Sequence, residues 1–291
     1  MKNFNITLCG NLILDIVSES HSFVEGGSNT ITSKKRTVGA IGNIIKSLQD
    51  LGENVDIHVQ SLVGNDDNGQ YITAWLDELS EKSNFKIVQN IKKSSEYNTS
   101  NAHIISNVEN NTRTSFVEWG ACTKIQNFEN SEDWFHLMYA DTFHSINLKD
   151  LKKITKNSTV SMDLCLHSHD FDKREKILNS LKYVDFLIAS DVELLSLANA
   201  DKKENAIKKL GKKCLGWCIM HYPEGSISSN GEKVIKLETK LIDKKINVLG
   251  AGDMFFSSFL SKINKNDFSE ENVKKALKFS HKNTKLYLEK K

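Results

Sequence analysis

The chain has 291 residues, which is enough to bury a full hydrophobic core as one large α/β domain or two small ones. Its 39 Lys and Arg residues nearly balance its 37 Asp and Glu residues and are scattered singly or in pairs, which argues against a nucleic acid as partner. No apolar stretch approaches membrane-spanning length, the N-terminus is too polar for a signal peptide, and the cysteines lack framework spacing. We therefore expect a cytoplasmic protein with reduced thiols and no membrane partner.

Short β-like runs alternate with amphipathic helical runs along the chain, without internal repeats or linkers. The first strand is predicted at 6–9, and apolar residues at helical spacing then predict a helix that stops at Gly52. This alternation predicts the α/β class, with a mostly parallel sheet that helices cover on both faces. Further strands are predicted at 55–59, 159–163, 186–188 and 217–219, an Asn-Gly hairpin is predicted at 227–235, and further helices are predicted around 75–79, 173–182, 191–199 and 274–291.

Two early stretches predict strands without helices. Residues 103–106 and 114–117 flank a polar turn and predict a β-hairpin, and residues within 16–38 predict a second strand pair. Edge decoration is one interpretation, and the other is a lid over a ligand, with its strands roughly within 16–38 and 95–118. A lid with an exposed β-face would bury that face against a second copy of the chain, which favours a homodimer through the lid.

The most informative segment is Asn247-Val-Leu-Gly-Ala-Gly-Asp253, which runs into an apolar stretch at helical spacing. Small residues let the backbone approach a ligand, and the start of a helix presents unpaired N–H groups and a positive dipole end. The amides of Gly250, Ala251 and Gly252 therefore predict a phosphate site. Asp253 lies in the same first turn and could accept the proton of an attacking hydroxyl, which predicts a phosphotransferase.

Four segments resemble the ribokinase-like (PfkB) carbohydrate kinases in sequence and in order. Residues 247–255 resemble the family motif Asp-Thr-x-Gly-Ala-Gly-Asp-x-Phe except at Asn247 and Val248, and residues 38–43 resemble its Gly-Gly-x-x-x-Asn pattern with the first glycine replaced. Residues 10–15 are similar to the strand end that carries a substrate-binding aspartate, and residues 63–69 match another recurrent segment. One such motif could occur by chance, but four in order make the resemblance specific.

The resemblance covers nearly the whole chain and implies one kinase domain over 1–291 with the ribokinase-like three-layer α/β/α fold and a small β lid. It implies an ATP-dependent, Mg²⁺-dependent enzyme that phosphorylates a hydroxyl group of a small sugar or sugar derivative. The short lid and residues 114–120 look most like the fructosamine kinase and fructokinase branch. The sequence leaves open which sugar and hydroxyl are used, and whether a monovalent cation is needed.

On the acceptor side, the resemblance implies sugar binding by Asp15, Gly39 and Asn43. A carboxylate accepts hydrogen bonds from two adjacent hydroxyl groups, and an amide both donates and accepts. Arg113 on the predicted hairpin could reach a phosphate or the sugar. Structural roles are the alternative: Asp15 as a turn cap, Asn43 as a partner for backbone groups, and Arg113 as a solvated edge residue.

On the metal and nucleotide side, the resemblance implies that Glu193 holds Mg²⁺ through water and that Ser190, Gly225 and Asn247 contact ATP. This side departs from the family pattern, which leaves room for weakened ATP use, altered metal geometry or a chain that does not catalyse. The departures are Ser190 and Cys165, each in place of an asparagine, and Met220, in place of a threonine.

The leading interpretation is therefore a sugar kinase that binds ATP and a small-molecule acceptor. A nucleoside kinase of the same fold is the nearest alternative, and an aromatic-lined acceptor pocket would favour it. A catalytically silent sugar-binding or nucleotide-binding relative is the alternative from another class. A dinucleotide-dependent redox enzyme is disfavoured, because Gly10 lacks the following glycines of a dinucleotide loop.

Overall fold

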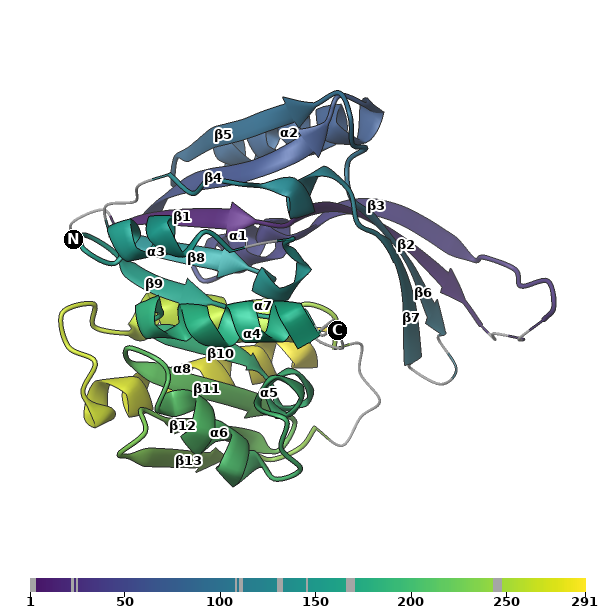
Figure 1. Cartoon of the computed structure of the whole chain (residues 1–291). Coiled ribbons are helices and arrows are strands. Elements are labelled where there is room, and N and C mark those ends of the chain that lie inside the picture. The colour runs from purple at the N-terminus through teal and green to yellow at the C-terminus, as the bar shows by residue number, and fades with distance from the viewer. Residues whose placement is uncertain are drawn as a thin grey trace.

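Figure 1 shows the computed structural model of the chain, in which residues 4–21, 24, 26–107, 109, 112–129, 133–144, 146–165, 171–242 and 248–291 are described. The larger of its two sheets has the strand order β13-β12-β11-β10-β9-β8-β1-β4-β5. All neighbouring pairs from β5 to β11 are parallel, and β12 and β13 are antiparallel at one edge. The strands are β1 (Phe4–Gly10), β4 (Val55–Gly64), β5 (Ile87–Ser94), β8 (Trp134–Met138), β9 (Thr159–Met162), β10 (Phe186–Ser190), β11 (Trp217–Tyr222), β12 (Gly225–Ser229) and β13 (Val234–Glu238).

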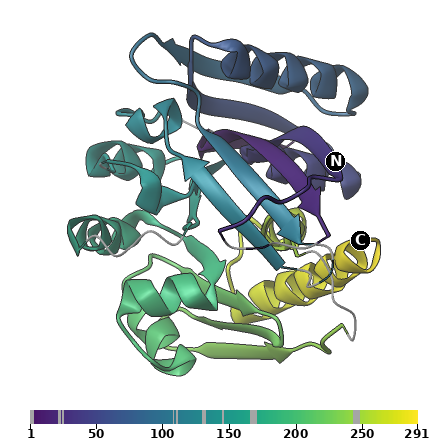
Figure 2. The same cartoon turned by 90° about the vertical axis from the view of Figure 1, so that its right-hand side faces the viewer.

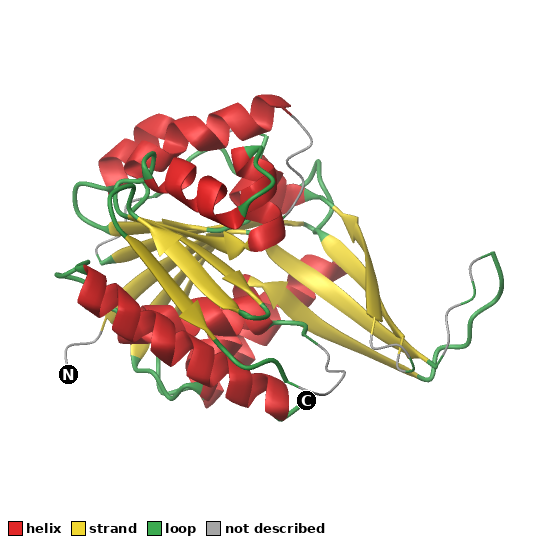
Figure 3. Ribbon diagram, turned by 90° about the horizontal axis from the view of Figure 1, so that it is seen from below, coloured by secondary structure: helices red, strands yellow, loops and turns green. Residues whose placement is uncertain are grey.

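Helices cover both faces of this sheet (Figure 3). Along β10, Phe186 and Ile188 join the core under one helix layer, and Leu187 and Ala189 join the core under the other, because successive side chains of a strand point to opposite faces. The first layer holds α1 (Ile41–Asp50), α2 (Asp67–Lys82), α7 (Ala251–Lys262) and α8 (Glu270–Glu289), and the second holds α3 (Leu148–Ile154), α4 (Phe171–Ser180), α5 (Asp191–Ala198) and α6 (Lys203–Gly211). The predicted three-layer α/β/α fold is confirmed.

A second, four-stranded sheet has the order β3-β2-β6-β7. It contains β2 (Leu12–Ser20), β3 (Ser33–Ala40), β6 (Asn101–Asn107) and β7 (Thr112–Glu118). Both strand pairs expected from the sequence are present: β2 is antiparallel to β3, and β6 is antiparallel to β7. Strand β2 follows β1 after a single residue, so the small sheet projects beyond the carboxyl end of the main sheet (Figures 1 and 2).

The local sequence explains where the elements near this edge begin. The side chain of Asp66 caps α2 by accepting a hydrogen bond of 2.8 Å from the Gly69 amide. Short 3₁₀ turns follow the small sheet at Ala121–Lys124, follow β8 at Ala140–Thr142 and precede β10 at Leu181–Tyr183. The carboxyl ends of parallel strands are where open α/β sheets bind ligands, so the small sheet faces the expected site.

Candidate active site

A cavity of about 310 Å³ lies between the small sheet and the carboxyl ends of the main-sheet strands. Side chains from both sheets line it, together with the start of α7. The cavity brings together most of the site residues that the sequence predicts, although they are separated by up to 238 positions in the chain, from 15 to 253. Those that line it are Asp15, Asn43, Arg113, Ser190, Glu193, Gly250, Gly252 and Asp253.

Asp253 lies in the first turn of α7, and the side chain of Asn43 on α1 forms a hydrogen bond with its carboxylate. Burial raises the pKa of Asp253 to about 7, and the nearby Asp163 carboxylate adds to this rise. Arg113 and Lys291 act in the opposite direction, because their positive charges favour the carboxylate. A carboxyl group with a pKa near neutrality can exchange protons at physiological pH, as a general base must.

Two of the three small residues before Asp253 are glycines, and the space around each of them shows why a side chain would not fit or would enter the cavity. Gly250 has a φ of 80°, and a β-carbon there would lie 2.6 Å from the hydroxyl of Tyr287 on α8. Gly252 is different, because the nearest atom to a β-carbon would be 3.6 Å away, in the ring of His221. The space beside Gly252 therefore belongs to the cavity rather than to packed protein.

One predicted anion donor is engaged within the turn. The Ala251 amide donates to the Val248 carbonyl oxygen at 3.1 Å, so it does not point freely at a ligand as predicted. The reason is the tight turn that sets up the left-handed Gly250. The first turn of a helix leaves its following amides without helical acceptors, so Gly252 and Asp253 provide the donors that remain.

On the acceptor side, Asp15 lies on β2 beside Gly39 on β3. Asp15 is 7% exposed, and burial together with the charge of Asp253 raises its pKa to about 7. Gly39 does not line the cavity; a β-carbon there would collide with the Asp15 carboxylate. Gly39 thus gives room to Asp15 rather than to a sugar, which corrects the direct contact that the sequence predicts.

The small sheet adds an apolar wall that the sequence analysis did not identify. Val117 and Trp119 line the cavity next to Arg113, and Ile104 of β6 lines it as well. Tyr139 approaches from the end of β8 with a left-handed φ of 54°. The sequence of β7 could not have predicted this wall, because its cavity-lining residues Arg113, Ser115 and Val117 include both polar and apolar side chains and show no alternation of the two.

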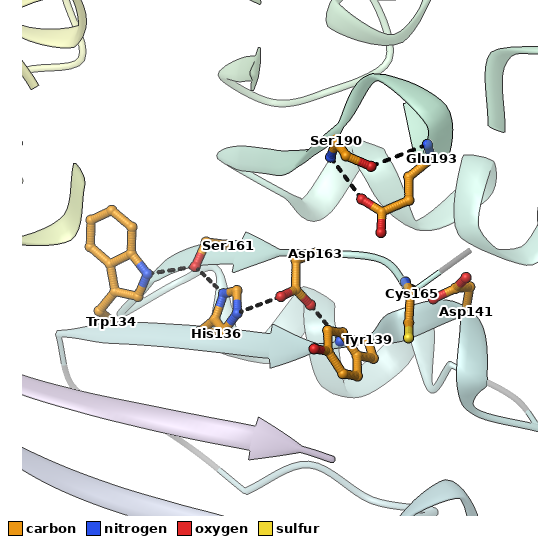
Figure 4. A network of polar contacts seen from close by, with 9 residues as sticks. All are labelled: Trp134, His136, Tyr139, Asp141, Ser161, Asp163, Cys165, Ser190 and Glu193. Atoms are coloured by element: carbon orange, nitrogen blue, oxygen red, sulfur yellow. Dashed lines mark hydrogen bonds and ion pairs between the residues drawn. The ribbon is translucent and has the colours of Figure 1, made fainter. Parts of the chain in front are cut away.

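The metal side contains two carboxylates near the ends of β9 and β10. Ser190 and Glu193 form a capping box at the start of α5, in which the Ser190 amide donates to Oε2 of Glu193 at 2.7 Å. Burial raises the pKa of Glu193 to about 7, and the charges of Asp163 and Asp141 add to this rise. Figure 4 shows Glu193 and Asp163 on either side of the same space.

A second cavity of about 480 Å³ adjoins the first and shares Gly252, Arg113 and His221 with it. One of the predicted nucleotide contacts, Gly225, does not lie there. Gly225 has a φ of 152° at the start of β12 and packs against the Leu237 carbonyl, so its role is in the hairpin. Asn247 lies outside the described residues. The second cavity is lined largely by residues of β11, α7, α8 and the segment after β13, among them Tyr222, Leu241, Phe255 and Leu288.

The three departures from the family pattern have different consequences. Met220 is fully buried and does not line either cavity, whereas the next residue, His221, lines both. Cys165 lines the first cavity, and its amide donates to Oδ1 of Asp141 at 2.7 Å. Ser190 replaces an amide side chain but still caps α5.

A model of the pfkB family carbohydrate kinases matches residues 4–291. The chain belongs to this family. It is therefore a kinase-family transferase, and the cavity at the start of α7 lies where the family resemblance places catalysis.

Three known proteins illustrate the range of this kinase family. An ATP-dependent 6-phosphofructokinase of Thermoanaerobacterium thermosaccharolyticum is 25% identical and aligns over 89% of this chain and 81% of its own length. A nucleoside kinase of Methanocaldococcus jannaschii is 26% identical over 89% of this chain and 83% of its own. The structure of a Vibrio cholerae fructokinase with fructose, ADP and calcium superposes on 98% of this chain and on 92% of the fructokinase chain, with a TM-score of 0.75 and 14% sequence identity.

Proposed function

We propose that this chain is an ATP-dependent kinase that transfers the γ-phosphate of ATP to a hydroxyl group of a small sugar or sugar derivative, with Asp253 as general base. The observation that carries the proposal is the position of the first turn of α7, where Asp253 lines the first cavity and Gly252 lines both. An acceptor hydroxyl in the first cavity and a phosphate from the second would meet beside Asp253. In-line transfer needs this alignment more than it needs covalent chemistry.

The acceptor side would orient the attacking hydroxyl group. Asp15 accepts hydrogen bonds from hydroxyl groups of the acceptor, and Asn43 holds the Asp253 carboxylate. Asp253 takes the proton of the attacking hydroxyl as the bond to phosphorus forms. Its raised pKa of about 7 matches a base that operates near neutral pH.

The phosphate side would stabilise the charge that develops on the transferred group. The amides of Gly252 and Asp253 and the positive end of α7 are fixed donors, which need no reorganisation during the reaction. Arg113 lines both cavities and adds a positive charge next to the phosphate path. Together these groups would replace the anion cradle of three amides that the sequence predicts.

The residues present fit ATP and Mg²⁺. The second cavity has an apolar wall and an open space beside Gly252, as a nucleotide with its phosphates requires. Within the described ranges no three His, Cys, Asp or Glu side chains form a ready metal site, which agrees with Mg²⁺ held by one or two carboxylates plus phosphate and water. Glu193 and Asp163 would hold the ion, which when bound neutralises phosphate charge. The fructokinase of the same fold binds ADP and a divalent ion, which supports this assignment.

Two acceptor classes compete for the first cavity. The sequence favours a ketose or fructosamine, and Asp15 with Asn43 suits the hydroxyl groups of either. The apolar wall of Ile104, Val117 and Trp119 favours a nucleoside, because a sugar alone carries hydroxyl groups that an apolar wall leaves unpaired. A flat base can stack on Trp119, and base–aromatic stacking contributes about 1–3 kcal/mol. The nucleoside is therefore our second candidate for the acceptor.

The test is ADP release with Mg-ATP over a panel of ketoses, aldoses, fructosamines, amino sugars and nucleosides. We expect turnover with one acceptor class and its loss in the Asp253→Asn variant. Turnover that survives this substitution would reject Asp253 as the base. Binding of ATP without turnover on any acceptor would favour the silent relative over the kinase.

A matched pair of substitutions, one in β7 and one directly after it, decides between the acceptor classes. Trp119→Ala removes the aromatic surface of the cavity, whereas Phe116→Ala removes a ring that is 57% exposed and does not line the cavity. For a nucleoside acceptor we expect KM to rise about fivefold or more with Trp119→Ala, in line with a loss of about 1–3 kcal/mol. An unchanged KM with Trp119→Ala would favour the ketose or fructosamine.

Three finer expectations are also proposals. A homodimer through the small sheet is supported by the exposed outer residues of β7, and sedimentation at several protein concentrations tests it. Dependence on a monovalent cation is tested by comparing rates in potassium and in a bulky organic cation. A cytoplasmic location is tested by fractionation. No helix in the described parts of the chain has the length and apolar character to span a membrane.

A further inference from the structure

A fully buried histidine lies directly behind Asp163. His136 is in β8, is 0% exposed and lines neither cavity. Its Nε2 atom is 3.6 Å from Oδ2 of Asp163, and no hydrogen-bond partner satisfies that atom within the described residues. A buried polar atom without a partner is costly, so its direction toward a carboxylate in the active site needs a reason.

Neighbouring side chains fix the histidine ring (Figure 4). His136 and Ser161 are paired across β8 and β9, and Ser161 Oγ lies 2.9 Å from Nδ1. Ser161 Oγ also accepts a hydrogen bond of 2.7 Å from the Trp134 indole, which can only donate. The hydroxyl proton of Ser161 is then available to Nδ1, and this arrangement leaves Nε2 as the N–H that faces Asp163. Phe256 stacks on the ring with the centroids 4.0 Å apart.

The two oxygens of the Asp163 carboxylate face different neighbours. The Tyr139 amide donates to Oδ1, and His136 is the side chain that reaches Oδ2 in the described part of the chain. Asp163 lines the first cavity, where its charge acts on both Asp253 and Glu193. The direction in which its two oxygens point therefore matters to the whole site.

We propose that His136 is a positioning residue for phosphoryl transfer: its Nε2 lies 3.6 Å from Oδ2 of Asp163 and, by shortening this distance to a hydrogen bond when ligand is present, holds the Asp163 carboxylate in the orientation in which Asp163 and Glu193 accept Mg²⁺. This inference rests on the proposed kinase function and deepens it. Hydrogen-bond partners of metal-binding carboxylates orient those ligands, and their loss typically lowers metal affinity or activity about ten- to a hundredfold. The role does not depend on the charge of the ring, because the neutral Nε2–H tautomer and the imidazolium both present this N–H.

The first experiment needs neither metal nor substrate. Nitrogen NMR of histidine-labelled protein reports which ring nitrogen carries hydrogen, and the signal that disappears in His136→Gln is that of His136. We expect hydrogen on Nε2. A ring that carries hydrogen on Nδ1 alone would overturn the proposal, because Nε2 would then have nothing to donate.

The second experiment compares two substitutions of the same side chain. His136→Phe keeps an aromatic ring against Phe256 and removes the donor, whereas His136→Gln returns an amide N–H near the position of Nε2. Calorimetry with a non-hydrolysable ATP analogue gives the Mg²⁺ concentration needed for half-maximal binding. We expect that concentration to rise about tenfold or more in the Phe variant and to recover in the Gln variant. An unchanged concentration in a folded Phe variant would overturn the proposal.

Trp217→Phe is the control for a general loosening of the core. It removes the buried indole donor to the Phe268 carbonyl oxygen from β11 of the same sheet, and it leaves the contacts of His136 with Ser161 and Asp163 in place. We expect lower stability with an unchanged Mg²⁺ concentration, and an equal rise in this control would overturn the proposal. If wild-type protein shows no turnover but keeps the His136-dependent Mg²⁺ effect, the proposed function fails while the positioning role holds.

Discussion

Asp253→Asn separates the chemistry of this site from its stability. Asparagine keeps the size of the side chain and can still accept a hydrogen bond from Asn43, but it cannot take a proton. We expect kcat to fall about a hundredfold or more, because a positioned general base contributes roughly 10²–10⁴-fold. In the wild type, kcat/KM should fall as the pH drops below about 7, since the base must be deprotonated and its pKa is raised to about 7.

The same substitution should stabilise the protein at high pH. The pKa of Asp253 is raised from 3.8 to about 7, so between these values the folded state holds a proton that the unfolded state has released. Wild-type stability should therefore fall as the pH rises from about 4 to about 7 and then level off. At about 1.4 kcal/mol per pKa unit, the upper bound of this cost is about 4 kcal/mol. We expect the Asp253→Asn variant to be more stable by about 1–4 kcal/mol at pH 8 and by little at pH 4.

Two measurements check this reasoning. Urea unfolding at pH 4 and pH 8 gives the stability difference, and initial rates of ADP release give kcat. Asp77→Asn on the exposed side of α2 is the control and should change neither quantity. Retained turnover would reject Asp253 as the base. An equal gain in stability at both pH values would show that a buried charge is not the cause.

Substitutions of three glycines give further predictions. Gly250→Ala should lower the free energy of unfolding by about 1–2 kcal/mol or more, because the left-handed backbone and the Tyr287 hydroxyl both oppose a β-carbon. Gly252→Ala should change unfolding by less than about 0.5 kcal/mol and instead raise KM for ATP; an unchanged KM would mean that the space beside it is not used by phosphate. Gly39→Ala should raise the acceptor KM about tenfold or more by displacing Asp15, since hydrogen bonds to charged groups are worth about 1.5–3 kcal/mol.

The parts of the fold that local patterns encode were predictable from the sequence. The small residues before Asp253 and the acidic first turn predict the start of α7, and the Ser190 and Glu193 pair matches a capping box. Alternating strand and helix patterns predict most of the main sheet, but the prediction omits β5, β8, α3 and α6. Strand β8 is short and wholly buried, so it has no alternation that would distinguish it.

The parts that depend on contacts distant in sequence were not predictable. His136 meets Ser161 and Asp163 only because β8 pairs in register with β9, which brings residues about 25 positions apart side by side. Trp119 becomes a wall of the cavity only when β7 joins the small sheet. Gly225 matched a family motif by sequence, yet its contact with the Leu237 carbonyl gives it a role in the hairpin. A motif fixes the residue type, and the packing decides what that residue contacts.

The electrostatics of the cavity argue against a catalytically silent relative. Burial raises the pKa values of Asp15, Glu193 and Asp253 to about 7, and it raises that of Asp163 as well. Four carboxyl groups facing one space destabilise the folded state at neutral pH, and no feature of the fold requires them there. Strongly perturbed groups that converge on a cavity are typical of functional sites. Ser190 and Cys165 stand where the family pattern has asparagine, beside these four carboxyl groups. All four carboxyl groups are nevertheless in place, and Mg²⁺ binding and proton transfer depend on carboxyl groups.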